Sequence, residues 1–181
     1  MIKGVIFDRD GTLIQHVPYL HHPADVVFFD GVMDALSQLH QAGVALFIAT
    51  NQSGIGRGLF TDDEYHRVAH HIHQVLDQHG IPIQQTYYCP YHPEHGIGHY
   101  KQDSHLRKPN PGMLLQAMAD HNLNASDVVM VGDSHVDIQA AARAGVRSAL
   151  VTTGVSVELM EINPNYIGPS VLDIVDNFIL A

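Results

Sequence analysis

Short, mostly apolar segments alternate along the chain with longer segments in which apolar residues recur at helical spacing. The short segments have the length of buried strands and cover residues 2–7, 44–50, 84–89, 127–133 and 147–151. The amphipathic segments predict helices over about residues 30–42, 62–79, 110–121, 135–144 and 170–179. Strands that alternate with helices in this way predict a Rossmann-like three-layer α/β sandwich with a central parallel sheet.

Residues typical of helix ends support these boundaries. Thr61 precedes the second helix and Gly80 follows it, while Asn110 and Pro111 are typical of an N-cap and a first helical position. Gly145 ends the fourth helix. The chain has no repeat and no linker-like composition, so we expect a single domain over residues 1–181.

Charge and composition narrow the range of partners. The 181 residues include 9 lysines and arginines against 19 aspartates and glutamates, a formal net charge of −10. This field repels a polyanion, so we expect no nucleic-acid partner, although a small anion can bind where basic residues gather. The chain has one cysteine, no apolar run long enough to span a bilayer and no signal-peptide pattern. We therefore expect no membrane partner and a cytoplasmic location.

The polar residues with the most useful chemistry stand at or just beyond the ends of the predicted strands. Asp8 follows the first strand, Thr50 ends the second and Asp133 ends the fourth. The segment after the third strand leads to Lys108. The carboxyl ends of parallel strands meet at one edge of a sheet, where such folds bind their ligands. We therefore expect these four side chains to share one site.

The acidic residues of this set favour a hard cation. Asp8 and Asp10 flank Arg9 at a strand end, where alternate side chains point the same way. Asp133 and Asp137 add two more carboxylates. Close carboxylates repel one another, and a bound cation relieves that repulsion, so the set predicts a Mg²⁺ site.

A phosphate site is predicted beside it. Thr50 offers a hydroxyl group, and the backbone amides of Asn51 and Gln52 are expected in a tight turn that could cradle phosphate. Lys108 supplies a cation that would neutralise a phosphoryl group. A nucleophile, a proton donor, a metal and a cationic clamp together make a phosphoryl-transfer site. Each motif alone is also typical of a plain turn, loop or helix start, so it is their joint order that indicates a function.

The motif order DRDGTL, TNQSG, RKP and VGDSHVD resembles the haloacid dehalogenase superfamily of aspartate-nucleophile phosphatases. Within it, the segments FFDGVMDAL, ATNQSGIGRG, RKPNPGM and MVGDSHVDIQAA are similar to the heptose bisphosphate phosphatases and the histidinol phosphate phosphatases. The resemblance covers about residues 2–175 and implies a fold without a large cap domain.

The resemblance implies a reaction through a covalent intermediate. Asp8 would attack phosphorus and become an aspartyl phosphate, while Asp10 would protonate the leaving alkoxide and then activate water. Asp8, the backbone carbonyl of Asp10 and Asp133 would hold Mg²⁺.

The other matched residues are implied to bind phosphate or substrate. The implied phosphate ligands are Thr50, Asn51 and Lys108. The residues implied to lie near the substrate are Arg9, Tyr19, Gln52, Ser53 and Arg107. Asp137 would orient Lys108 or the metal shell, and Arg57 is a candidate for a second phosphate of a bisphosphate.

One segment departs from the resemblance. The heptose phosphatases carry a zinc loop before the RKP motif, and its four ligand positions fall here on Cys89, Tyr91, Ser104 and Leu106. Only Cys89 suits zinc, so we expect no structural Zn²⁺ here but a loop of solvated histidines around a half-buried Cys89. The alternative is a rebuilt site made of Cys89 and nearby histidines. These histidines are His92, His95, His99 and His105.

These features lead to one expected function and several alternatives. We expect a Mg²⁺-dependent phosphomonoester hydrolase that acts on a small-molecule ester, with a sugar phosphate such as heptose 1,7-bisphosphate favoured. The alternative substrate is histidinol phosphate. The alternatives from another class are a receiver-like phospho-accepting signalling domain and an inactive binding homologue. Asp10 argues against a receiver, because an acid/base beside the nucleophile hastens turnover. We expect the loops 14–27, 52–60 and 90–107 to shape an open site.

Overall fold

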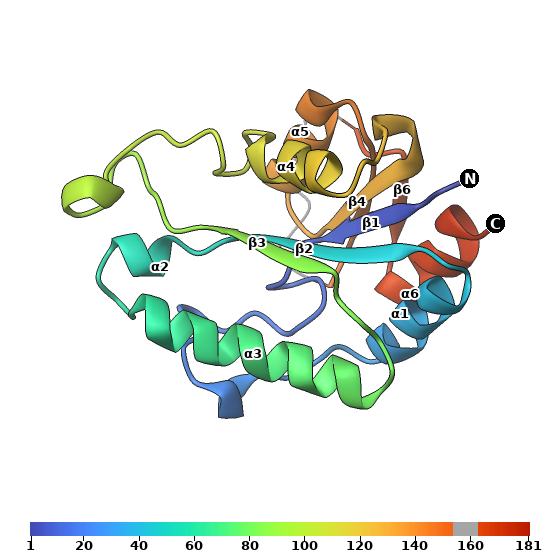
Figure 1. Cartoon of the computed structure of the whole chain (residues 1–181), viewed down its shortest axis with the longest axis horizontal. Helices are drawn as coiled ribbons and strands as arrows, with labels where there is room; N and C mark the ends of the chain where they lie inside the picture. The colour runs from blue at the N-terminus through green and yellow to red at the C-terminus, as the bar shows by residue number, and fades with distance from the viewer. Residues whose placement is uncertain (154–162) are drawn as a thin grey trace.

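A computed structural model describes residues 1–153 and 163–181 of the chain. Within these residues, six parallel strands form one sheet in the order β3-β2-β1-β4-β5-β6 (Figure 1). The strands are β1 Gly4–Phe7, β2 Ala45–Asn51, β3 Gln85–Cys89, β4 Val128–Gly132, β5 Arg147–Val151 and β6 Tyr166–Gly168. The parallel sheet predicted from the alternating pattern is confirmed.

Helices connect β1 to β5 in turn and end close to the predicted boundaries. The longer helices are α1 Val32–Gln41, α3 Asp62–Gln78, α4 Gly112–Asp120 and α5 His135–Ala144. The shorter ones are α2 Ser53–Gly56, α6 Val171–Ile174 with its π-helical continuation Val175–Ile179, and single 3-10 turns at Pro23–Asp25, Gly98–Tyr100 and Ala125–Asp127. Thr61 caps α3 as predicted, because its hydroxyl accepts from the Glu64 amide while the Glu64 carboxylate accepts from the Thr61 amide.

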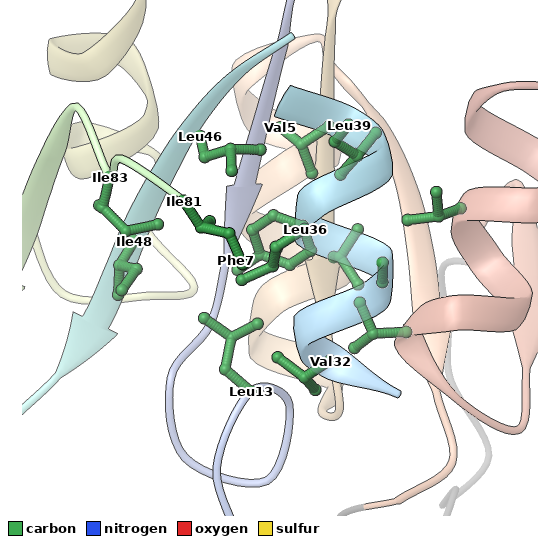
Figure 2. Close-up of a cluster of buried hydrophobic side chains, with 14 of the residues drawn as sticks. Val5, Phe7, Leu13, Val32, Leu36, Leu39, Leu46, Ile48, Ile81 and Ile83 are labelled. Atoms are coloured by element: carbon green, nitrogen blue, oxygen red, sulfur yellow. The ribbon is translucent and has the colours of Figure 1, made fainter. Parts of the chain in front are cut away.

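Each face of the sheet is covered by its own set of helices. Val5 and Phe7 of β1 point to one face, where they pack in one cluster with apolar residues of α1, α3 and α6 (Figures 1 and 2). Ile6, between them, points to the other face and packs with Phe47 and with α4 and α5 (Figure 1). The central strands β1, β2 and β4 are buried on both faces and are mostly apolar, and the predicted three-layer sandwich is confirmed.

The strand β6 was not part of the sequence prediction. Its three residues form no apolar run, and contacts from distant residues hold it beside β5. The Ser148 amide donates to the Asn165 side chain and the Asn165 amide donates to the Ser148 carbonyl, each at 2.8 Å. Such long-range pairing leaves no local periodic signal.

Two helix starts also differ from the sequence prediction. The one-turn helix α2 lies in a segment that the sequence predicts to be a loop. The prediction misses it because two of its four residues are glycines, which disfavour helix. The helix α4 begins at Gly112 with Pro111 as its N-cap, so the assignment of Asn110 as the N-cap is wrong. The Asn110 side chain instead donates to the Ser104 carbonyl at 3.0 Å.

The strand order places a ligand site between β1 and β4. The chain proceeds from β1 to β2 on one side, while β4 lies on the other side of β1. The carboxyl ends of β1 and β4 therefore flank the topological switch point, and Asp8 and Asp133 follow directly from them. Among the residues described, no helix is both long and apolar enough to cross a membrane.

Candidate active site

A pocket of about 280 Å³ lies at the carboxyl ends of these strands. The predicted site residues that line it are Asp8, Arg9, Asp10, Tyr19, Thr50, Asn51, Gln52, Ser53, Lys108, Asp133 and Asp137. The lining residues that sequence reasoning did not assign to the site are His16, Val17, Leu20, Gly54, Phe60, Ser134 and Val136. Most of these are apolar or small, so their side chains carry no chemical signal, although several belong to the loops 14–27 and 52–60. The third loop expected to shape the site, 90–107, contributes no residue to the lining of this pocket.

The turn after β1 depends on a glycine. Gly11 has φ 85°, a left-handed conformation that other residues rarely adopt. A Cβ at this position would also collide with the Asp133 carboxylate. Glycine therefore lets the segment that carries Asp8 and Asp10 pack directly against the end of β4.

Lys108 is the electrostatic centre of the pocket. Its Nζ donates to Asp8 Oδ1, to Asp137 Oδ1 and to the Ala49 carbonyl, each at 2.7 Å. The Lys108 side chain is only 2% exposed, so these acceptors replace its hydration shell. The second oxygen of Asp137 accepts from the Ser134 hydroxyl at 2.6 Å. Asp137 thus lies between the start of α5 and Lys108 and fixes the direction of the ammonium group.

Three buried carboxylates lie close together here, and two of them, Asp8 and Asp137, are bonded to Lys108. Oxygens of Asp8, Asp133 and Asp137 all lie within 4.8 Å of one another. Burial raises the pKa of Asp8, with Lys108 opposing this effect and the neighbouring carboxylates acting in the same direction as burial. Burial lowers the pKa of Lys108, but Asp137 and Asp8 outweigh this effect and raise it. One ammonium group against three carboxylates leaves an excess of negative charge, which a hard divalent cation would neutralise.

The Asp10 carboxylate lies in a separate hydrogen-bond network. Its Oδ1 accepts from Arg9 Nη2 at 3.0 Å, and its Oδ2 accepts from Arg9 Nε and Gln52 Nε2, both at 2.9 Å. Gln52 Nε2 also donates to Thr50 Oγ1 at 2.9 Å. The side chain of Asp10 is therefore directed at protein donors, and a contribution of Asp10 to a metal site would come from its backbone carbonyl.

Asn51 holds the backbone of Lys108. Its Nδ2 donates to the Lys108 carbonyl at 2.9 Å, and its Oδ1 accepts from the Lys108 amide at 3.0 Å. The Gln52 amide donates to the Cys89 carbonyl at 2.8 Å, in line with the pairing of β2 and β3. The prediction that the Gln52 amide cradles phosphate is therefore wrong, and the Asn51 side chain is committed to Lys108.

Two arginines proposed near the substrate are bonded to other parts of the protein. Arg107 is not among the residues that line the pocket, and its Nη1 donates to the Tyr91 carbonyl at 3.3 Å. Arg57 Nη1 donates to the Tyr19 hydroxyl at 2.8 Å, and its guanidinium carbon lies 5.4 Å from the centre of the Tyr19 ring. This pair joins the loop 14–27 to the segment after α2.

Of the four positions aligned with a zinc loop, only Cys89 carries a zinc-type ligand. Cys89 is fully buried, so the expectation of a half-buried thiol is wrong. Tyr91 and Leu106 pack against the same core cluster, and Ser104 is buried beside them. Burial raises the pKa of the Cys89 thiol, which disfavours the thiolate that zinc requires. The expectation that no structural zinc binds here stays a prediction.

Comparisons with known proteins agree with this geometry. A HAD-hydrolase-like family model matches residues 105–174. The chain is 40% identical over 149 residues to a D-glycero-alpha-D-manno-heptose-1,7-bisphosphate 7-phosphatase from Burkholderia mallei, covering 82% of this chain and 79% of that protein. It is 39% identical over 176 residues to the corresponding beta-bisphosphate 7-phosphatase from Pasteurella multocida, covering 96% and 95%.

Similarity of the fold extends over nearly the whole chain. The crystal structure of D,D-heptose 1,7-bisphosphate phosphatase from B. bronchiseptica, in complex with magnesium and phosphate, matches with a TM-score of 0.86 and 29% identity, covering 99% of both chains. The motifs, the pocket and these similarities all point to one family. The chain belongs to the haloacid dehalogenase-like hydrolases, as a relative of the heptose 1,7-bisphosphate 7-phosphatases, and is a phosphatase.

Proposed function

We propose that this phosphatase is a Mg²⁺-dependent phosphomonoester hydrolase that works through an aspartyl phosphate on Asp8. The observation that carries the proposal is the position of Lys108, whose ammonium group lies 2.7 Å from Asp8 and from Asp137. It neutralises the nucleophile and lies where a transferred phosphoryl group would need positive charge. Asp133 completes the carboxylate cluster at the same strand ends.

The reaction needs two displacements at phosphorus. In the first, an oxygen of Asp8 attacks phosphorus, the bond from phosphorus to the leaving oxygen breaks, and Asp10 gives its proton to that oxygen. In the second, Asp10 takes a proton from water, the water oxygen attacks phosphorus, and the bond to Asp8 breaks. The products are an alcohol, inorganic phosphate and the original Asp8 carboxylate.

The residues present fit a magnesium ion. Asp8, Asp133 and the backbone carbonyl of Asp10 would hold it, and their hard oxygen ligands are those that Mg²⁺ prefers. When bound, Mg²⁺ supplies positive charge to the phosphoryl oxygens. Thr50 would donate its hydroxyl hydrogen to a phosphoryl oxygen, while Lys108 would neutralise the charge that develops there.

We further propose a sugar bisphosphate of the heptose 1,7-bisphosphate class as the substrate. The curated relatives described above are phosphatases of this substrate, at about 40% identity over most of the chain. They give no support to the histidinol phosphate, receiver or inactive-homologue alternatives. We also propose that the protein acts in the cytoplasm, which the single cysteine of the chain supports.

A substrate panel tests this proposal. Phosphate release would be measured with Mg²⁺ on heptose 1,7-bisphosphate, the corresponding monophosphates, other sugar phosphates and histidinol phosphate. We expect the highest kcat/KM on the heptose bisphosphate and release of only one of its two phosphates. A higher kcat/KM on histidinol phosphate would overturn the substrate assignment while leaving the hydrolase assignment intact.

A further inference from the structure

The Asp10 carboxylate is held by more donors than a freely rotating side chain would have. Three N–H groups from Arg9 and Gln52 point at its two oxygens, at 2.9 to 3.0 Å. A carboxylate offers about four acceptor positions, so three of these are occupied and one remains, on Oδ1. Rotation of the Asp10 side chain would break several of these bonds at once. These donors crowd Oδ2 more than Oδ1, so Oδ1 is the oxygen better placed to carry a proton.

Gln52 connects this proton donor to the phosphate-binding hydroxyl. Its amide nitrogen has two hydrogens, and one is donated to Asp10 Oδ2 while the other is donated to Thr50 Oγ1. The opposite amide orientation would place the Gln52 oxygen against a carboxylate, so the nitrogen must face Asp10. Because Thr50 Oγ1 already accepts from Gln52, its own hydrogen is left to donate to a phosphoryl oxygen in the pocket.

The other side of Asp10 is supported by a buried arginine. Arg9 is 3% exposed, and its guanidinium lies 6.0 Å from the centre of the Tyr65 ring. Its Nη1 is buried with no hydrogen-bond partner among the described residues, so Arg9 directs its paired donors at Asp10 alone. Gln52 is 6% exposed, so water cannot readily replace either support.

We propose that Gln52, together with Arg9, is a positioning residue for Asp10. Gln52 sets the orientation of the proton donor relative to the phosphoryl site, because the same nitrogen holds Asp10 and Thr50. This inference rests on the proposed function, in which Asp10 protonates the leaving group. It assigns Gln52 to proton transfer and not to the substrate contact implied by the family resemblance.

Substrates with leaving groups of different basicity distinguish a role of Gln52 in proton transfer from a role in substrate binding. The p-nitrophenolate ion leaves without a proton, whereas an alkoxide needs one from Asp10. Gln52→Met keeps the size of the side chain but removes both hydrogen bonds. The rate of phosphoenzyme formation from an alkyl phosphate would be measured by rapid quench. We expect this rate to fall by about 100-fold, since small displacements of a catalytic group cost about this much. The p-nitrophenol burst with p-nitrophenyl phosphate depends on the Thr50 contact but not on the proton from Asp10, so it should fall by only about fivefold.

Two further variants make the experiment decisive. Gln52→Asn keeps an amide but shortens its reach, and it should show the same selective loss if Gln52→Met does not fold. Gln78→Met, on the exposed end of α3, is the matched control and should leave both rates unchanged. Equal losses on the two substrates, or no loss on either, would overturn the positioning role.

These experiments distinguish failure of the positioning role from failure of the proposed function. If wild-type protein forms no phosphoenzyme from either ester, or if Asp8→Asn does so as well as wild type, the proposed function is wrong and this inference falls with it. If wild type is active and Asp8→Asn is inactive, but the Gln52 variants show no selective loss, only the positioning role is contradicted.

Discussion

At the scale of single residues, Lys108 is a buried cation that forms ion pairs with both Asp8 and Asp137. Its ammonium group is buried against two carboxylates, so removing it would leave both uncompensated. We expect Lys108→Met to abolish phosphatase activity and to lower the free energy of unfolding by about 3 kcal/mol, as is typical when one partner of a buried ion pair is lost. Urea unfolding measures this, with the exposed Lys101→Met as the control. An unchanged unfolding midpoint would show that Lys108 is not the counter-charge we describe.

Asn51 acts on the same lysine through its backbone. Asn51→Ala removes the partners of the Lys108 amide and carbonyl, which costs about 2 kcal/mol for two partly buried groups. We also expect kcat to fall by at least about tenfold, because the ammonium group would shift relative to Asp8. The comparison is Asn177→Ala at the exposed carboxyl-terminal end of the chain, which should change neither quantity. Full activity in Asn51→Ala would mean that the loop places Lys108 without this clamp.

At the scale of elements, strands and long helices follow from local pattern, but short elements do not. The apolar runs and the Thr61 cap predict β1, β2, β4 and α3 because each is specified by residues close in sequence. In contrast, β6 depends on pairing with β5, and α2 contains two glycines in a single turn, so tertiary contacts decide both.

The contact between α3 and β3 adds a pH dependence to stability. Burial lowers the pKa of His73, whose Nε2 lies 2.8 Å from Thr86 Oγ1. A histidine with a lowered pKa in the folded state stays neutral there while the unfolded chain takes up the proton, so stability is lost as pH falls below about 6.5. The raised pKa of Asp8 acts in the opposite direction, so the effect of His73 is measured by comparison. Between about pH 7.5 and pH 5.5, we expect the melting temperature of His73→Gln to change more favourably than that of the wild type.

Differential scanning fluorimetry across pH measures this effect. The exposed His66→Gln, on the same helix, should keep the wild-type pH dependence. If both variants behave alike, His73 does not contribute to acid sensitivity.

At the scale of the whole molecule, an acidic chain concentrates a cationic and an anionic centre at one sheet edge. The sequence predicts that Asp8, Thr50, Lys108 and Asp133 share one site, because parallel strands bring their carboxyl ends together at one edge of the sheet. Side-chain partners could not be predicted in the same way. The sequence indicates that Asp10, Gln52 and Arg9 are near one another, but only the structure shows that they form hydrogen bonds with each other. Likewise, only the structure shows that Arg107 bonds to the Tyr91 carbonyl and does not line the pocket.

Removal of the metal tests whether the carboxylates at this edge of the sheet need a divalent cation. We expect chelation by EDTA to abolish activity and added Mg²⁺ to restore it, and Mg²⁺ should raise the melting temperature because it binds only the folded site. Asp133→Asn should lose both effects, whereas the exposed Asp63→Asn should keep them. Full activity in EDTA would contradict a metal-dependent mechanism.

The central claim is that Asp8 carries the phosphoryl group, and trapping the intermediate tests it most directly. The enzyme would be mixed with Mg²⁺ and a phosphate ester, quenched in acid, digested and mapped by mass spectrometry. We predict phosphate on Asp8, labile to hydroxylamine, and neither phosphoenzyme nor turnover in Asp8→Asn. Phosphate on another residue, or near-normal turnover by Asp8→Asn, would contradict this account.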